Sequence, residues 1–271
     1  MLIPFENKQI YVECHGEGAP IVMLNGIMMS TRSWKPFVKS LSANNRLILF
    51  DFFDQGQSDR HPEQYDLDLQ VDALCALFGH LGLSQAVVCG ISYGGSVALK
   101  FAVRHPEQVG RLILFNSTAR TGEWLKTLGD GWIKNVQDPE AFYLATIPII
   151  YSQDFYNRRS TWTRARRDFL VEQVFTNNNF MEGLTRLIKS AESYDIISEI
   201  GAITAKTLIV ASQQDAITPT CCQEDLHRLI KGSELVLLPG VGHATMYETP
   251  ALFASLLLGF ANAHLDEISV S

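Results

Sequence analysis

A serine flanked by glycines, in the segment G-I-S-Y-G-G at residues 90–95, is the feature that most constrains how this chain can fold. The apolar run Ala86–Cys89 precedes this segment and predicts a buried strand, and the run Ser96–His105 follows it with a helical pattern. Glycine lacks the Cβ atom that would collide where a strand turns sharply into a helix. The sequence therefore predicts a strand, a tight turn with the hydroxyl of Ser92 at its tip, and a helix whose first amides face the same space.

A serine hydroxyl is an effective nucleophile only when a base takes its proton and a third group orients that base. Asp215 follows the apolar run Lys206–Ala211, and His243 follows the run Glu234–Leu238 and a glycine-containing turn. Polar residues that follow parallel strands meet at the carboxyl edge of the sheet. We therefore predict a catalytic triad of Ser92, Asp215 and His243, in the chain order typical of this strand–turn–helix motif.

Predicted strands and helices alternate through most of the chain. Short apolar runs bounded by turn residues predict strands at Lys8–Cys14, Ile21–Leu24, Leu47–Phe50, Ala86–Cys89, Leu112–Phe115, Thr207–Ala211 and Glu234–Leu238. Helical patterns between several of them predict helices at Leu67–Leu81, Ser96–His105 and Pro250–Ala263. This alternation indicates an α/β fold with a mostly parallel central sheet and helices on both faces.

Taken together, these motifs resemble the α/β-hydrolase superfamily over essentially the whole chain. Further segments that carry the resemblance are L-N-G-I at 24–27 through Trp34, residues 51–59, and Gly-His at 242–243. The resemblance implies an α/β-hydrolase fold and an oxyanion hole formed by the backbone amides of Ile27 and Tyr93. A serine triad and backbone amides suffice for acyl transfer, so no cofactor and no metal is expected.

The resemblance also implies a helical cap inserted in the core. No convincing strand pattern occurs from about residue 119 to residue 205, where aromatic residues and arginines become frequent. We therefore expect a core of residues 1–118 and 206–271 and a cap of residues 119–205. Apolar side chains expected to line a pocket above the serine are Met28, Met29, Ile147, Ile150, Tyr151, Phe155 and Trp162.

Two departures from many relatives resemble a subgroup of acyltransferases that move 3-hydroxyacyl chains from acyl carrier protein. They are Asn25-Gly26 where many relatives have His-Gly, and Phe53-Asp54 where many have Arg-Gly. The cap also contains a cluster of arginines, namely Arg158, Arg159, Arg164, Arg166 and Arg167. This cluster is either a solvated helix face paired with acidic neighbours or a dock for the phosphate of acyl carrier protein or coenzyme A.

Composition excludes several other classes. The formal net charge of -7 argues against nucleic acid as a partner. No apolar run is long enough to span a bilayer, and the N-terminal residues lack the pattern of a signal peptide. The five cysteines form no recognisable disulfide framework or metal-ligand spacing. The expectation is a cytoplasmic protein.

These observations favour a serine hydrolase that cleaves a small carboxylic ester or thioester with an apolar acyl group through an acyl-enzyme. One alternative is an acyltransferase that uses acyl carrier protein or coenzyme A, since it would share every catalytic residue. A second alternative is a ligand receptor that keeps the triad but signals through its cap.

Overall fold

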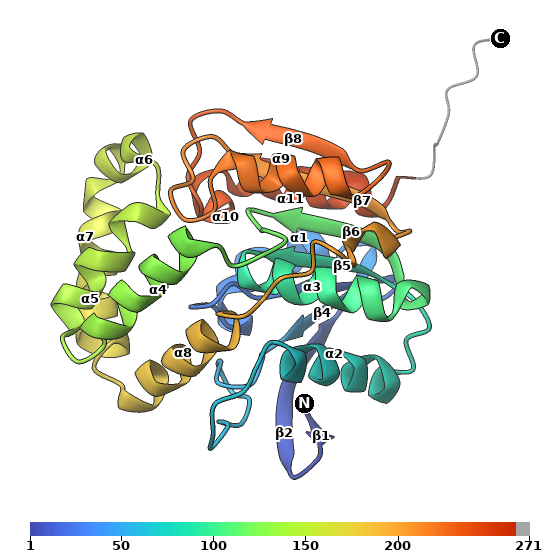
Figure 1. Cartoon of the computed structure of the whole chain (residues 1–271), viewed down its shortest axis with the longest axis horizontal. Coiled ribbons are helices and arrows are strands. Elements are labelled where there is room, and N and C mark those ends of the chain that lie inside the picture. Colours follow the sequence, from blue (N-terminus) through green and yellow to red (C-terminus); the bar gives the residue numbers. More distant parts are fainter. Residues whose placement is uncertain (264–271) are drawn as a thin grey trace.

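The computed structural model describes residues 1–263, and its centre is an eight-stranded sheet of order β1-β2-β4-β3-β5-β6-β7-β8 (Figure 1). The pairs β1–β2 and β2–β4 are antiparallel, and the other neighbouring strands are parallel. The strands are β1 Leu2–Phe5, β2 Lys8–His15, β3 Ala19–Leu24, β4 Asn45–Phe50, β5 Ala86–Ile91, β6 Val109–Phe115, β7 Lys206–Ser212 and β8 Glu234–Leu238. Residues 264–271, the end of the expected core segment, lie outside the described residues.

The predicted fold class is confirmed, and each predicted strand is present. Strand β1 was not predicted, because it is only four residues long and contains Pro4, which cannot donate a hydrogen bond to a sheet. The tertiary structure tolerates Pro4 because β1 is the edge strand and pairs only with β2. Glu6 in the connecting turn has φ 52°, a left-handed conformation that apolar periodicity does not reveal.

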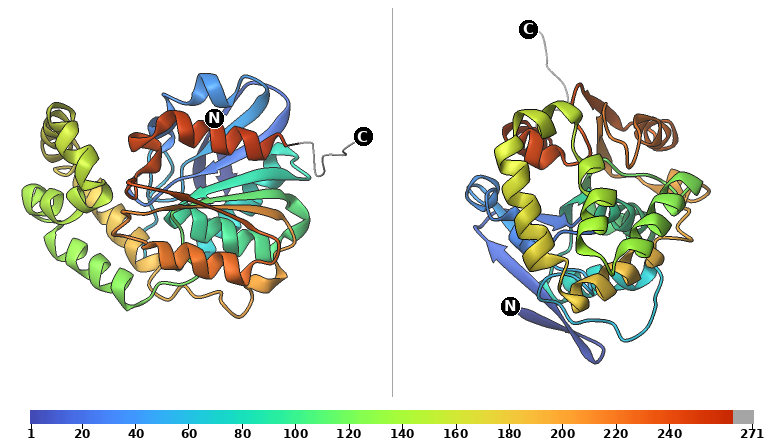
Figure 2. Two further views of the ribbon diagram at one scale, coloured as in Figure 1. Left: turned by 90° about the horizontal axis from the view of Figure 1, so that it is seen from above. Right: turned by 90° about the vertical axis from the view of Figure 1, so that its left-hand side faces the viewer.

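Helices cover both faces of the sheet (Figure 2). Successive strand residues point to opposite faces, so Val22 and Leu24 of β3 belong to one core and Ile21 and Met23 to the other. The first core is covered by helices α2 Asp68–Leu81, α3 Tyr93–Arg104 and α9 Thr220–Leu229. The second is covered by α1 Val38–Leu41 and α11 Pro250–Ala261, and the short α10 Thr245–Glu248 precedes α11.

The segment between β6 and β7 forms the cap, which lies to one side of the sheet in Figures 1 and 2. Its helices are α4 Glu123–Asn135, α5 Pro139–Thr146, α6 Gln153–Arg158, α7 Ser160–Phe169 and α8 Asn178–Ser190. A third apolar core holds the cap together and includes Ile217 and Ala244 from the loops of the α/β core. An isolated antiparallel bridge between Arg120 and Asp195 joins the two ends of the insertion. No helix within residues 1–263 is both long and apolar enough to cross a membrane.

Polar side chains cap the starts of three cap helices, α5, α6 and α8. The side chain of Asp138 accepts hydrogen bonds from the amides of Glu140 and Ala141, both at 3.0 Å, at the start of α5. Ser152 and Asn177 cap α6 and α8 in the same way. Each of these side chains satisfies an amide that the helix itself leaves unpaired, and so fixes where α5, α6 and α8 begin.

A buried ion pair fastens α8 to the core. The carboxylate of Asp54 accepts hydrogen bonds from Nη2 of Arg186 at 2.7 Å and from Nε at 3.1 Å. The side chain of Asp54 is fully buried, whereas that of Arg186 is 18% exposed. Gly183 of α8 packs directly on Asp54, because a Cβ atom at Gly183 would lie 2.9 Å from the Asp54 carbonyl oxygen. The Phe53-Asp54 departure therefore has a structural role in this chain, which is to anchor the cap.

Replacing Asp54 with asparagine should lower the free energy of unfolding by about 2 kcal/mol, because the partly buried guanidinium of Arg186 loses its counter-ion. Asparagine tolerates the left-handed backbone at this position, where φ is 67°. Asp225→Asn is the matched control, since it removes an exposed ion pair with Arg228 and should change stability by less than about 0.5 kcal/mol. Urea denaturation followed by circular dichroism measures both values. Equal stability of the two variants would contradict an anchoring role.

Candidate active site

Ser92 lies at a strained turn between β5 and α3. Its backbone has φ 52° and ψ −117°, a conformation that non-glycine residues rarely adopt. The amide of Ser92 donates to the Phe115 carbonyl at 2.9 Å, and the hydroxyl of Ser117 donates to the Ser92 carbonyl at 3.0 Å. Contacts to the neighbouring strand β6 and to the residues after it therefore hold this conformation in place.

The glycines around Ser92 are needed for close packing. A Cβ atom at Gly90 would lie 2.5 Å from the Cα atom of Gly95. A Cβ atom at Gly94 would collide with the carbonyl oxygen of Leu24, and one at Gly95 would collide with the side chain of Ser117. Helix α3 can therefore approach the ends of β3 and β5 only with glycine at these positions.

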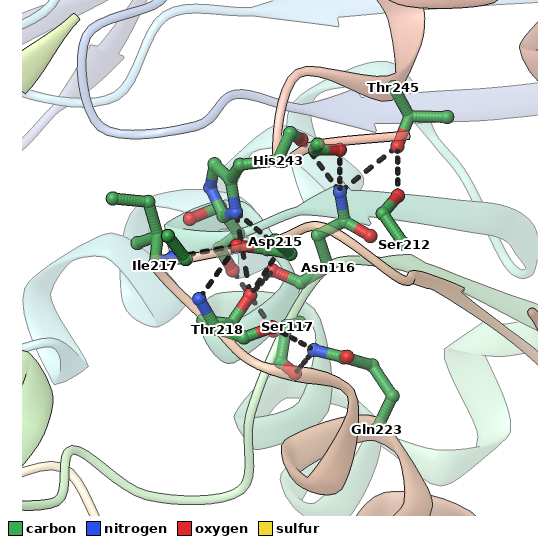
Figure 3. A network of polar contacts seen from close by, with 12 residues as sticks. Asn116, Ser117, Ser212, Asp215, Ile217, Thr218, Gln223, His243 and Thr245 are labelled. Carbon is green, nitrogen blue, oxygen red and sulfur yellow. Dashed lines mark hydrogen bonds and ion pairs between the residues drawn. The ribbon is translucent and has the colours of Figure 1, made fainter. Parts of the chain in front are cut away.

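His243 and Asp215 form a hydrogen-bonded pair at the carboxyl edge of the sheet (Figure 3). Nδ1 of His243 is 2.7 Å from Oδ2 of Asp215. The Asp215 side chain is fully buried, and the His243 side chain is 11% exposed. A carboxylate at this distance assigns the proton of a neutral imidazole to Nδ1, which leaves Nε2 free to accept a proton.

Four hydrogen bonds fix the carboxylate of Asp215. Its Oδ1 accepts from the amides of Ile217 at 2.8 Å and Thr218 at 2.9 Å. Its Oδ2 faces both Nδ1 of His243 and the hydroxyl of Thr218, the latter at 2.9 Å. Each carboxylate oxygen therefore has its own set of donors, so the carboxylate cannot turn away from the imidazole without losing bonds.

Asn116 positions the histidine loop, a role that the sequence patterns did not indicate. Its Nδ2 donates to the carbonyl of His243 at 2.6 Å and to the hydroxyl of Thr245 at 3.0 Å (Figure 3). Asn116 follows β6 directly and has φ 50°. The signal available in the sequence was a polar residue directly after a buried strand, which is related to the signal for Asp215 and His243, since those two lie in loops that follow predicted strands.

The two predicted oxyanion residues, Ile27 and Tyr93, line the same cavity as Ser92 and His243. Gln55 supports the loop that contains Ile27, because its Nε2 donates to the carbonyls of Gly26 at 2.9 Å and Ile27 at 3.2 Å. These bonds fix the peptide planes on either side of Ile27. The loop is therefore held rigidly next to the serine.

Asn25 is the centre of a buried polar network beneath that loop. Its Oδ1 accepts from the indole of Trp34 at 2.7 Å, and its Nδ2 donates to the Phe50 carbonyl at 2.8 Å and to Oε1 of Gln55 at 3.1 Å. Asp51 lies beside it, and burial raises the pKa of its carboxyl group despite amide donors from Gln57 and Thr31. Where many relatives have histidine, this chain thus has Asn25, whose side-chain amide forms hydrogen bonds through both its oxygen and its nitrogen within the protein.

A cavity of about 210 Å³ opens above Ser92 and is lined by residues of the cap and the core. Of the side chains expected to line it, Met28, Met29, Ile147, Ile150 and Tyr151 do so. Phe155 and Trp162 lie instead behind Tyr151, with ring centroids 5.4 Å and 5.7 Å from its ring. Lining residues that we did not predict include Leu125, Leu128, Trp132, Leu170, Phe175, Phe180 and Ile188. They lie on the amphipathic helices of the cap and the adjoining turns, whose inner face cannot be assigned before the helices are packed.

Within the predicted arginine cluster, Arg166 is set apart from Arg164 and Arg167, which line a separate small pocket. Arg158 pairs with Asp154 at 2.8 Å, and Arg167 pairs with Glu140 at 2.6 Å and with Asp168 at 3.1 Å. Arg159 and Arg164 are exposed, and Arg166 lines the cavity. Docking of acyl carrier protein or coenzyme A at this cluster stays a prediction.

The chain belongs to the α/β-hydrolase family, because the family model described as "alpha/beta hydrolase fold" matches residues 19–250. The crystal structure of MGS-M2, an α/β-hydrolase enzyme from a Medee basin deep-sea metagenome library, is 40% identical and covers 100% of both chains, with a TM-score of 0.97. AB hydrolase superfamily protein YisY of Bacillus subtilis strain 168 is 29% identical over 95% of this chain and 97% of its own. The pimeloyl-[acyl-carrier protein] methyl ester esterase of Nitrosomonas europaea is 28% identical over 91% of this chain and 97% of its own.

Proposed function

We propose that this chain is a serine hydrolase that cleaves a carboxylic ester or thioester with an apolar acyl group. The observation that carries the proposal is the His243–Asp215 pair, at 2.7 Å, beside a cavity that also contains the strained Ser92. Membership of a family of hydrolases supports the reaction class, and the esterase from Nitrosomonas europaea supports the choice of an ester.

In the first proposed step, Nε2 of His243 accepts the hydroxyl proton of Ser92 as the serine oxygen attacks the acyl carbon. Asp215 keeps the imidazole oriented and stabilises the positive charge that develops on it. The backbone amides of Ile27 and Tyr93 donate to the oxyanion, and each such donor contributes about 3 kcal/mol in comparable sites. Protonated His243 then gives its proton to the leaving alcohol or thiol, and an acyl-enzyme remains.

In the second proposed step, His243 takes a proton from water as the water oxygen attacks the acyl carbon. The bond between that carbon and the Ser92 oxygen then breaks, His243 returns its proton to the serine oxygen, and the acid is released. The same residues would serve an acyltransferase, in which a bound hydroxyl replaces water. The two reactions differ in the acceptor that the cap admits.

The cavity lining supports an apolar acyl group. Met28, Met29 and Ile147 offer flexible and branched apolar surface next to the loop of the proposed oxyanion hole. Each methylene buried there should contribute about 0.8 kcal/mol, which corresponds to roughly a fourfold gain in kcat/KM.

Hydrolysis of p-nitrophenyl esters of increasing acyl length tests the proposal. We expect kcat/KM to rise from acetate to a medium chain length and then to fall once the chain exceeds the cavity. A maximum at acetate would contradict an apolar acyl pocket. A burst of p-nitrophenol that stalls until a 3-hydroxyacyl acceptor is added would instead favour acyl transfer.

A further inference from the structure

Arg166 places a positive charge in the wall of the cavity. It lies on α7 of the cap, and its guanidinium carbon is 5.5 Å from the ring centroid of Trp162 and 5.0 Å from that of Tyr247. Tyr247 belongs to α10, which begins two residues after His243. The guanidinium therefore lies on the histidine side of the cavity, clamped by aromatic rings from the cap and the core.

Among the described residues, this guanidinium has no acidic partner. The neighbouring Arg158 and Arg167 each form an ion pair with a carboxylate. By contrast, no carboxylate of residues 1–263 lies within 4.0 Å of a nitrogen of Arg166. Its Nε is buried and has no hydrogen-bond partner in this part of the chain. No aspartate or glutamate of the described residues lines the cavity.

A half-buried cation without a counter-ion is unfavourable unless something else compensates it. Aromatic faces compensate in part, because ring quadrupoles attract cations. Burial lowers the pKa of Arg166, but interactions with the hydroxyl groups of Tyr151 and Tyr247 outweigh this and raise it. The guanidinium of Arg166 is thus positively charged beside the cavity where substrate would bind, and its Nε–H donor has no partner among the described residues.

We propose that Arg166 binds a carboxylate of the substrate, so that the preferred esters carry a carboxylate remote from the scissile carbonyl. This inference rests on the proposed function, because it assigns the substrate class of the same cavity. Arginine suits this role, since its planar fork donates two parallel hydrogen bonds to a carboxylate. The remaining wall is apolar and would hold the carbon chain between the two polar ends.

Binding to the Ser92→Ala protein tests the inference without requiring turnover. Two pairs of ligands are compared by titration calorimetry. Methyl hydrogen adipate against methyl hexanoate places the carboxylate on the acyl side, and 6-acetoxyhexanoate against hexyl acetate places it on the alcohol side. We expect the acid of one pair to bind about 10- to 100-fold more tightly than its neutral partner, which is the range for charge-assisted hydrogen bonds.

The Arg166→Gln substitution in the same background should remove that preference, and Arg166→Lys should retain part of it because the charge remains. Arg164→Gln, which removes an exposed guanidinium from the same helix, should leave the preference unchanged. Thermal melts report whether each variant is folded. If Arg166 only cross-links α7 to α10 through its ring contacts, Arg166→Gln lowers the melting temperature and leaves the acid-to-neutral ratio unaltered, which would overturn the inference.

The comparison of each acid with its neutral partner in the Ser92→Ala protein does not depend on how the Arg166 variants fold, because Arg166 is unchanged in it. Equal or weaker binding of both acids relative to their neutral partners would also overturn the inference. If the wild-type chain hydrolyses none of these esters but the acids still bind in an Arg166-dependent way, the proposed reaction alone would be overturned. The two proposals can therefore fail separately.

Discussion

Replacing Ser92 with alanine should reduce kcat for the best p-nitrophenyl ester by about 10⁴-fold or more, with little change in KM. Alanine removes the nucleophile and leaves the proposed oxyanion amides and the cavity in place, so substrate still binds but no acyl-enzyme forms. Steady-state kinetics measures the loss. Labelling with a fluorophosphonate, which reacts with activated serines, should disappear in the same variant.

Ser117→Ala is the matched control, because it removes a neighbouring serine hydroxyl that donates to the Ser92 carbonyl at 3.0 Å. The loss of one such hydrogen bond should cost about tenfold or less in kcat. Turnover that survives in Ser92→Ala while Ser117→Ala is inactive would refute the assignment of the nucleophile.

Replacing Asp215 with asparagine should reduce kcat by about 10³- to 10⁴-fold, and the geometry explains why. Oδ1 of Asp215 accepts hydrogen bonds from the amides of Ile217 and Thr218, so the asparagine carbonyl oxygen must take that position. Its NH₂ group then faces Nδ1 of His243 and donates to it. The imidazole is forced into the tautomer with a proton on Nε2, which cannot accept the proton of Ser92.

The kinetics of Asp215→Asn are measured with the same ester, and Asp225→Asn on the exposed face of α9 serves as the control. The melting temperature of Asp215→Asn should stay near that of the wild-type chain, since both loop amides keep an acceptor. Activity within tenfold of the wild type in this variant would show that Asp215 does not orient the base.

The core of the fold could be predicted because its strands carry local signals. Strands such as Ala86–Ile91 are buried on both faces and therefore form short, continuous apolar runs. The position of Ser92 follows from the same logic, since glycines at 90, 94 and 95 mark a turn with no space for side chains. Asp215 and His243 were predicted as site residues because each lies in a loop that follows a predicted strand, buried in the case of β7 and partly exposed in the case of β8.

Other features of the site depend on contacts between distant parts of the chain. The hydrogen bonds that Asn116 donates to the carbonyl of His243 and to the hydroxyl of Thr245 join it to the histidine loop, more than 120 residues away in the chain. The anchoring role of Asp54 depends on Arg186 of the cap. Phe155 and Trp162 have the same apolar character as the lining residues, but the packing of α6 and α7 places them one layer behind Tyr151.

The sequence by itself determined the α/β core, the strained turn at Ser92 and the chain order of Ser92, Asp215 and His243, because strand periodicity and glycine requirements act over a few residues. The tertiary structure alone decided which cap side chains face the cavity, and it separated Arg166 from the other arginines of its cluster. The physical reason is that the direction of a side chain on a short amphipathic helix is set by the surfaces against which the helix packs. In this protein, those surfaces come from distant parts of the chain.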